Sequence, residues 1–472
     1  MSELPAGWAL ARISDIAEVN PPRNAKLPAE ALVSFVPMAS VEAESGRIDV
    51  PEARRHEDLR TKSYRPFAEG DVLFAKITPC MENGKAAVAR RLINGHGFGS
   101  TEFHVLRPRP GISADYLLHY LLQSGFRHNA ARNMKGTAGQ LRVPASHLSG
   151  HPIPVPPVAE QVRIVAAIEE QFSRLDAGMA ALERVRQNLK RMRAAVLQAA
   201  VTGRLVTSDP RDPPIEGLAS SDILPEPLYS GQPANWTTTT IGRIAWITSG
   251  ATPSRSRKEY WANGCIPWVT STLVNNDTIA HAKEFVTPLA LCETSIKLMP
   301  AGTLLVAMYG EGQTRGRCSE LHIEATTNQA CASIVLRETL QLVRRYVKLA
   351  LTASYEANRR LSVGGVQPNL SVGTIKNLRI ALPPDSEQAR IHDESSRQLA
   401  FISHLEDELK EQRDHAESLR SSILAAAFSG KLVPQDPSDE PASLLLERIA
   451  AQQAVSSKPQ PTRKPRQSRL PA

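Results

Sequence analysis

The most regular pattern of apolar and polar positions lies between Glu160 and Val201. Apolar residues return there every seven positions, at Ile168, Leu175, Leu182, Leu189 and Val196. Charged residues such as Arg184 fill the positions between them. This spacing predicts one long amphipathic helix with an apolar seam for a partner helix. Pro156-Pro157 precedes the segment, and proline before the first turn is typical of the start of a helix.

The same pattern returns 227 residues later, after Pro383-Pro384. The apolar ladder is repeated at Ile402, Leu409, Ala416 and Ile423. Both segments are followed by a glycine, Gly203 or Gly430, which is a signal for the end of a helix. Each helix would contain about 42 residues and span roughly 60 Å. Because so long a helix with an apolar stripe is not stable alone in water, we predict that the two pack on each other as a coiled coil.

The duplication also includes the segments between the helices. Pro5-Ala6-Gly7-Trp8 corresponds to Pro233-Ala234-Asn235-Trp236, 228 positions later. Short strand-like runs such as 33–36 and 71–75 are separated by glycine, proline and asparagine, and residues 113–123 have a helical pattern. The chain is therefore predicted to contain two similar α+β domains with more strand than helix.

These boundaries divide the chain into seven predicted parts. In chain order they are a globular domain at 1–155, a long helical region at 156–207, an exposed linker at 208–232, a second globular domain at 233–382, a second helical region at 383–433, a short docking helix at 434–454 and a disordered basic tail at 455–472. The tail is assigned on its composition, since five basic residues and no acid occur between Lys458 and Arg469.

Composition narrows the class of protein further. The chain has 56 Lys and Arg against 48 Asp and Glu, a net charge of +8 over 472 residues, which mildly favours a polyanionic partner. Its five cysteines include no CxxC pair, so a zinc site is not expected and reduced thiols are. There is no basic start followed by an apolar run, and no apolar stretch of the roughly 18 residues that a membrane helix needs. We therefore expect a soluble cytoplasmic protein.

A loop with basic and amide side chains follows a predicted strand in each globular domain. Its candidate nucleic-acid contacts are Lys76, Asn83 and Lys85 in the first domain and Gln313, Arg315 and Arg317 in the second. Glycine lets backbone approach a ligand closely, and these side-chain types reach phosphates and base edges. The alternative is an ordinary hairpin turn with solvated charges. The presence of such a loop at the same place in both domains favours binding.

A second pair of loops precedes the long helices. The candidate contacts are Thr137, Gln140 and Arg142 in the first domain and Gln367 and Asn369 in the second. Glutamine and asparagine can hold adenine with two hydrogen bonds, and Gly-Thr can offer amides to a phosphate. A flexible joint between domain and helix explains this pair equally well.

The second domain carries a further loop, the most basic short stretch in either domain. Its candidate contacts are Thr252, Ser254, Arg255, Arg257 and Lys258. The aromatic residues Tyr260, Trp261 and Trp268 nearby are interpreted as core residues and not as stacking platforms.

Catalytic motifs are missing from the sequence. Asn20-Pro21-Pro22-Arg23 imitates the Asn-Pro-Pro-aromatic motif of amino-methyltransferases, but Arg23 replaces the aromatic ring and no glycine-rich cofactor loop accompanies it. No GxxxxGK[ST], HExxH, GxSxG or nuclease-like carboxylate-lysine cluster occurs. Two basic modules without a catalytic set favour binding over turnover.

The chain resembles the specificity subunit of type I restriction-modification systems. The segments typical of that family are Phe74 to Lys85, Gly99-Ser100-Thr101-Glu102-Phe103, Pro156-Pro157 with Glu160-Gln161, Gly250-Ala251-Thr252-Pro253-Ser254 and Ser429-Gly430-Lys431-Leu432. The resemblance covers residues 1 to 450, although the linker at 208–232 has no firm counterpart.

The resemblance implies a non-catalytic subunit that reads double-stranded DNA. Each globular domain would be a target recognition domain for one half of a split, asymmetric site, and the long helices would form an antiparallel spacer. The implied partners are two methyltransferase subunits, which bind S-adenosylmethionine and methylate a flipped adenine, and restriction subunits that cleave DNA. No cofactor would be bound by this chain itself.

Two other functions are compatible with the residues alone. One is a stand-alone enzyme such as a methyltransferase or nuclease, which turnover by the isolated chain would support. The other is a coiled-coil adaptor that binds proteins or RNA. It would be favoured if the basic loops could be neutralised without any effect on DNA affinity.

Overall fold

The computed structural model describes residues 4–22, 27–49, 51–137, 139–309, 314–354 and 370–456. The chain divides into two compact units. Unit 1 contains Met1–Leu182 and Glu411–Ala472, and unit 2 contains Glu183–Lys410. The boundaries fall inside the two long helices, so each unit consists of one globular domain and part of both helices.

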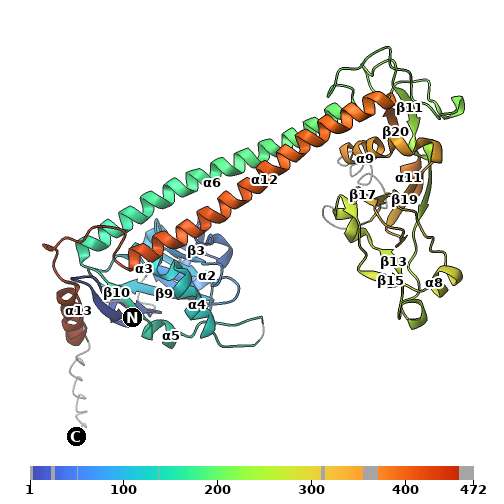
Figure 1. Cartoon of the computed structure of the whole chain (residues 1–472). Coiled ribbons are helices and arrows are strands. Elements are labelled where there is room, and N and C mark those ends of the chain that lie inside the picture. The colour runs from blue at the N-terminus through green and yellow to red at the C-terminus, as the bar shows by residue number, and fades with distance from the viewer. Residues whose placement is uncertain are drawn as a thin grey trace, which may run out of the picture. The chain divides into compact units, whose positions relative to one another are not determined.

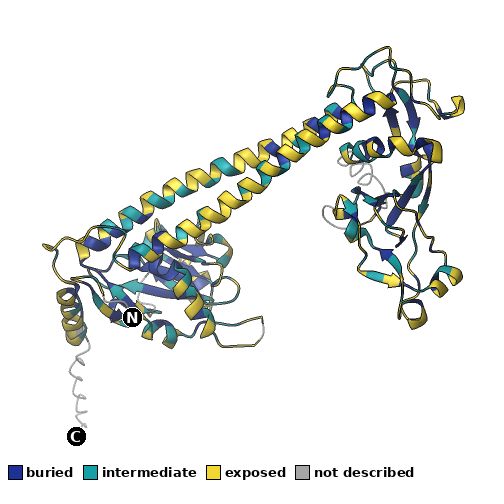
Figure 2. Cartoon of the chain, in the orientation of Figure 1, coloured by how far each residue is buried: buried dark blue, intermediate teal, exposed yellow. Residues whose placement is uncertain are grey.

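The long helices are α6 (Val158–Val201) and α12 (Asp385–Phe428), with 44 residues each. At 1.5 Å per residue each measures roughly 66 Å. In unit 2 the apolar seam predicted from the heptads is buried, with Leu189, Val196 and Ile402 at its centre. Within each unit the helices lie side by side (Figure 1), and much of their outer faces is exposed (Figure 2). The predicted packing of the two helices is confirmed.

The helices are antiparallel, because unit 1 contains the start of α6 with the end of α12, and unit 2 contains the end of α6 with the start of α12. In unit 2 Arg193 of α6 donates to Glu406 of α12 at 2.8 Å. In unit 1 Asp176 of α6 pairs with Arg420 of α12. A lower residue number on α6 therefore goes with a higher one on α12.

The globular domain of unit 1 is built from short strands and a few helices. The strands are β1 (Ala9–Arg12), β2 (Ala17–Val19), β3 (Leu32–Val36), β4 (Glu52–Arg55), β5 (Arg65–Ala68), β6 (Val72–Ala75), β7 (Ala86–Val88), β8 (His96–Gly99), β9 (Phe103–Pro108) and β10 (Pro152–Val155). The helices are α1 (Ile13–Ile16), η1 (Met38–Ser40), α2 (His56–Arg60), η2 (Ile93–Gly95), α3 (Ala114–Leu122), α4 (Ser124–Arg132), α5 (Ala145–Gly150) and, near the C-terminus, α13 (Ala442–Ser456).

The strands of unit 1 form three sheets, with the orders β2-β9-β6-β7, β4-β3-β8-β5 and β1-β10. β3 and β8 are parallel, whereas β6 and β9 are antiparallel, with Val72 opposite Leu106. Helix α3 begins after Ser113, whose hydroxyl accepts from the Tyr116 amide as an N-cap. The main core joins α3, β6 and β9 to the helix residues Ile164 and Ile423.

The globular domain of unit 2 has a similar plan. Its strands are β11 (Thr237–Thr240), β12 (Ala245–Ser249), β13 (Ile266–Val269), β14 (Thr278–Ile279), β15 (Glu284–Val286), β16 (Leu304–Ala307), β17 (Cys318–Leu321), β18 (Thr326–Thr327), β19 (Cys331–Leu336) and β20 (Arg379–Leu382). The helices are η3 (Ser220–Asp222), α7 (Ile241–Ile244), η4 (Lys258–Tyr260), η5 (Ser271–Asn275), α8 (Pro288–Glu293), η6 (Glu338–Val343), α9 (Arg344–Ala353) and α11 (Val372–Lys376).

The strand pairing confirms that the two domains are copies of one fold. The sheets of unit 2 have the orders β12-β19-β16-β17-β14, β15-β13-β18 and β11-β20. The pairing of Leu304 with Ile334 in β16 and β19 repeats that of Val72 with Leu106 in β6 and β9. The predicted α+β class, with two similar strand-rich domains and two long helices, is confirmed.

The linker at 208–232, predicted to be exposed, is in part packed against the rest of unit 2. Asp212 pairs with Arg390 of α12 at 3.0 Å, and 227 positions later Asp439 pairs with Arg163 of α6 at 2.6 Å. Asp222 of the linker is buried against the second domain. The duplication therefore extends beyond the glycines that end the helices, because each helix start is held by the segment that follows the other helix.

Helix α13 packs on the first globular domain. Its residues Leu445 and Ile449 are buried in the core of unit 1. The Ala442 amide donates to the Gly7 carbonyl at 2.9 Å. Among the residues described, no helix is both long and apolar enough to cross a membrane.

Candidate nucleic-acid interface

Two loops that the sequence marks separately meet in the first domain. Residues 135–137 and 139–142 form the two sides of a hairpin, in which Lys135 and Arg142 exchange backbone hydrogen bonds of 2.9 Å. Thr78, in the loop after β6, donates its amide to the Leu141 carbonyl at 3.0 Å, and its hydroxyl accepts from the Leu141 amide at 3.2 Å. The Thr78 hydroxyl also lies 3.4 Å from the Gly139 carbonyl. One threonine thus joins both candidate loops into a single surface.

A charged cluster lies where these loops meet. Arg142 donates from Nε and Nη2 to the two carboxylate oxygens of Glu102, each at 2.9 Å. Lys76 Nζ lies 4.0 Å from the same carboxylate and donates to the Thr101 carbonyl at 2.7 Å. Two predicted contacts, Lys76 and Arg142, are therefore held by Glu102, which the sequence placed in a typical segment but not among the site residues.

The two cations of this cluster differ in how far they are buried. The Lys76 side chain is 14% exposed, whereas that of Arg142 is 39% exposed. Burial lowers the pKa of Lys76, and the positive charges of Arg65 and Arg142 act in the same direction. The hydrogen bonds from Arg142 lower the pKa of Glu102, so its carboxylate remains charged at neutral pH. Lys76 is positioned to support the loop, and Arg142 is the cation that a ligand can reach.

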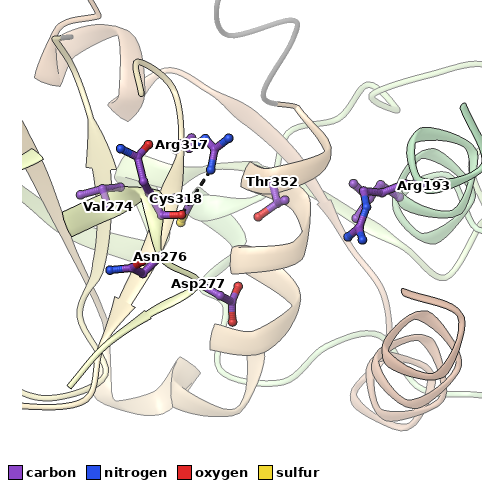
Figure 3. A pocket seen from close by; sticks show the side chains of 9 residues that line it. Arg193, Val274, Asn276, Asp277, Arg317, Cys318 and Thr352 are labelled. Atoms are coloured by element: carbon purple, nitrogen blue, oxygen red, sulfur yellow. Dashed lines mark hydrogen bonds between the residues drawn. The ribbon is translucent and has the colours of Figure 1, made fainter. Parts of the chain in front are cut away.

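Lys85 and Arg317 occupy equivalent backbone positions. Lys85 accepts from the Ala75 amide and Arg317 from the Ala307 amide, both at 3.0 Å. Each side chain donates to a backbone carbonyl: Lys85 Nζ to Met38 at 3.1 Å, and Arg317 Nη1 to a residue of η5 at 3.2 Å (Figure 3). Both predicted contacts therefore brace their loops through these hydrogen bonds.

The other predicted contacts in the first domain are more accessible. Asn83, Thr137 and Gln140 are exposed. The Gln140 amide donates to the Thr137 carbonyl at 3.0 Å, which closes the hairpin turn. Amide and hydroxyl groups at a fixed turn can donate to and accept from base edges.

In the basic loop of the second domain, both arginines lie on aromatic rings. Arg255 lies 3.8 Å from the centre of the Trp261 ring and pairs with Glu284. Arg257 lies 4.3 Å from the centre of the Tyr260 ring and also pairs with an acid, Glu293, at 3.0 Å. Stacking and ion pairing fix the planes of both guanidinium groups.

The remaining residues of this loop are polar and accessible. Thr252 donates to Gln329, Ser254 and Ser256 share a hydrogen bond of 2.8 Å, and Lys258 is exposed. Tyr260 and Trp268 are buried core residues as predicted. Trp261 is partly buried and packs against the same core, and its ring also carries Arg255.

Three predicted contacts, Gln313, Gln367 and Asn369, lie outside the described residues. Arg315 lies just beyond the first of these gaps and is half-buried. The described part of the chain contains no group of three or more His, Cys, Asp or Glu side chains that could hold a metal ion. The candidate site is most fully described in the first domain. There Thr78 joins the two loops and Glu102 holds their cations.

Comparison with known families supports a common origin for both halves. The model of the type I restriction modification DNA specificity domain matches residues 5–189 and 233–412. The chain is 27% identical over 467 residues to the EcoEI specificity subunit of Escherichia coli, covering 82% of this chain and 77% of that protein. It is 24% identical to the StySPI specificity subunit of Salmonella potsdam, covering 98% and 99%. A match to the Escherichia coli EcoAI subunit is 33% identical but spans only 44% of that relative.

Solved structures share the fold. A chain from a structural study of complex assembly and conformational transition of the type I R-M system superposes with a TM-score of 0.70 at 19% identity, covering 91% of this chain and all of that one. The HsdS subunit from Thermoanaerobacter tengcongensis superposes with a TM-score of 0.54 at 20% identity, covering 91% and 98%.

Proposed function

The chain belongs to the family defined by the type I restriction modification DNA specificity domain, and from this premise we propose that it is the DNA-reading subunit of a type I restriction-modification complex. It reads a bipartite, asymmetric site, with one globular domain for each half. Contacts to base edges supply sequence specificity, and contacts to phosphates supply affinity that depends on salt.

The observation that carries this proposal is that the two globular domains share one backbone arrangement but carry different side chains on it. The loops ending in Lys85 and Arg317 repeat the same amide-to-carbonyl hydrogen bond from the preceding strand. The side chains around those loops differ between the copies. The charged residues Lys76 and Glu102 of the first domain have no charged equivalents in the second domain. Two copies of a frame with different contact residues fit two different half-sites.

The proposed partners follow from the same assignment. Two methyltransferase subunits bind S-adenosylmethionine and modify an adenine in each half-site, and restriction subunits cleave the DNA. The chain itself is proposed to be non-catalytic and to hold no cofactor. Candidate docking surfaces are the outer helix faces, where Val162, Met192 and Phe401 are exposed, and α13, where Leu444 is exposed.

A domain exchange tests the proposal. The chain is purified with its methyltransferase partner, and modified adenines are mapped to define the site. Replacing residues 1–155 with the corresponding domain of another specificity subunit should change one half-site and leave the other unchanged. An unchanged site, or a change in both halves, would contradict the proposal. The isolated chain, incubated with DNA and S-adenosylmethionine, should methylate nothing.

A further inference from the structure

The hydrogen bonds of Arg142 leave a defined part of its guanidinium group available. A guanidinium group has five N–H bonds. Nε and Nη2 each donate to Glu102 at 2.9 Å, and Nη1 donates to the Gln140 carbonyl at 3.1 Å. Three of the five are used in this way, and one N–H remains on each of Nη1 and Nη2. These two neighbouring nitrogens match a ligand with two adjacent acceptors.

The backbone on both sides of this ion pair is fixed. Arg142 lies in the hairpin with Lys135, whose two backbone hydrogen bonds are each 2.9 Å long. Glu102 lies between β8 and β9, where its carbonyl accepts from the Lys76 amide at 2.9 Å and its amide donates to the Ser100 hydroxyl at 3.2 Å. Because both partners are anchored, the guanidinium plane is set before any ligand arrives, which lowers the entropy cost of binding.

The second domain has the same backbone but not the same charges. The Met308 amide donates to the Ala330 carbonyl at 2.8 Å, in the place of the bond from Lys76 to Glu102. Met308 is buried and apolar, and Ala330 has no carboxylate to offer. The fold therefore does not need an ion pair at this position. The charged cluster of the first domain is therefore not required by the shared fold. This is expected for residues that determine DNA specificity.

We infer that Glu102 is a positioning residue that holds Arg142 so that its two remaining N–H bonds read a guanine in the half-site of the first domain. Guanine presents the adjacent acceptors N7 and O6 in the major groove, and an arginine fork is their usual partner. The inference rests on the proposed function and adds a residue and a base to it.

Electrostatics favours a base over a phosphate as the ligand of Arg142. A phosphate is bound mainly through charge, and Glu102 cancels much of the charge of Arg142 at a contact distance of 2.9 Å. A base edge is neutral and is recognised by the direction of the donors, which Glu102 leaves intact and fixes. Without the carboxylate, Arg142 and Lys76 would become less selective cations that bind any DNA.

The test uses the complex with its methyltransferase partner and the mapped site. Affinities are measured on duplexes in which each base pair of the first half-site is replaced in turn, and on a duplex with 7-deazaguanine, which lacks the N7 acceptor. Arg142→Lys keeps the charge and loses the fork. Glu102→Gln keeps the shape and loses the charge. Arg132→Ala removes an exposed cation at the end of α4 in the same domain and serves as the control.

Arg142→Lys should weaken binding to the intact site by about tenfold to a hundredfold. It should then no longer distinguish guanine from 7-deazaguanine at one position. Glu102→Gln should lose part of the discrimination at that same position and bind unrelated DNA more tightly. Discrimination in the second half-site, which the other domain reads, should stay unchanged in both variants. Arg132→Ala should leave discrimination at every position unchanged.

Several outcomes would overturn the inference. An even loss over all duplexes, with a salt slope lower by about one, would make Arg142 a phosphate contact. A first half-site without guanine, or equal losses in both half-sites, would also overturn it. If the unmodified complex recognised no bipartite site, the proposed function itself would fail, which is a separate result.

Discussion

In unit 1 the globular domain is tied to the helix pair through an arginine on α12. Arg420 pairs with Asp176 on α6 and donates to the Glu44 carbonyl of the globular domain at 3.2 Å. Its guanidinium group also lies 4.3 Å from the centre of the Phe172 ring. The cavity left beside these residues is only about 160 Å³. One side chain therefore connects both helices and the domain.

The equivalent arginine of unit 2 connects the helices alone. Arg193, 227 positions before Arg420, donates to Ser403 and Glu406 of α12, both at 2.8 Å. A pocket of about 460 Å³ lies between it and domain residues such as Thr352, and Figure 3 shows the two residues on separate helices that line this pocket. Copies of one fold are thus attached differently, and we infer that the second domain has more freedom to adjust on its helices.

The first prediction concerns the starts of the two long helices, which are buried in the same way in both units. Ile164 and Ile391 are equivalent and fully buried, each in the core of its own unit. Ile164→Ala and Ile391→Ala should each lower the free energy of unfolding by about 2 to 5 kcal/mol, because both leave a cavity in a packed core. Denaturant unfolding measures this, with Val162→Ala, at an exposed position of the same helix, as the control. A clearly smaller loss for Ile391→Ala would mean that the weaker attachment of unit 2 extends to its core.

The second prediction uses a histidine found at the attachment in unit 1. His119 of α3 packs against Phe172, and burial lowers its pKa from 6.5 to about 4; Asp115 opposes this shift and Arg420 adds to it. The unfolded chain therefore binds a proton below pH 6.5 that the folded chain does not. This histidine alone should therefore contribute a loss of roughly 3 kcal/mol in stability as the pH falls from 6.5 to about 4, and His104 of the same domain, whose pKa burial also lowers to about 4, should add to the loss.

Hydrogen exchange of the α3 amides as a function of pH measures this loss in unit 1. His119→Leu should reduce the pH dependence by about one proton, whatever its effect on absolute stability. An unchanged pH dependence in the variant would show that another group causes the acid sensitivity.

The third prediction tests the two arginines directly. Arg420→Ala should destabilise unit 1 by about 1 to 3 kcal/mol, because a largely buried charged hydrogen-bonding group is removed and its partners lose their bonds. Arg193→Ala should cost only about 0.5 to 1 kcal/mol, since its ion pair is half-exposed. Exchange of the α3 amides and of the α9 amides reports the two effects separately. Equal effects would remove the basis for calling the second domain less firmly attached.

The sequence predicted the helices well because their signals are local and repeated. Heptad spacing, prolines before the first turn and glycines after the last occur twice, 227 residues apart. The repeat of Asp212 at Asp439 was also present in the sequence, but without an apolar ladder it did not identify the linker as part of the duplication.

The site was predictable only in part. Basic and amide side chains indicated which loops to consider, yet the junction through Thr78 links residues about 60 positions apart, and no periodic pattern encodes such a contact. The role of Glu102 could not be predicted either, because the sequence does not show that its carboxylate pairs with Arg142. Tertiary contacts decide which of the candidate cations brace the fold and which can reach a ligand.

The last prediction concerns ion pairs within one helix, for which we expect the smallest loss of stability. Arg174 pairs with Glu170 on the exposed surface of α6 in unit 1, and Arg397 pairs with Glu394 on α12 in unit 2. Arg174→Ala and Arg397→Ala should each reduce stability only slightly, because exposed pairs on one helix gain little over water. Both losses should fall further at high salt, measured by denaturant unfolding. If either loss approached that of Arg420→Ala, the larger effect could be assigned to helix stability alone, and the contact with the globular domain would not be needed to explain it.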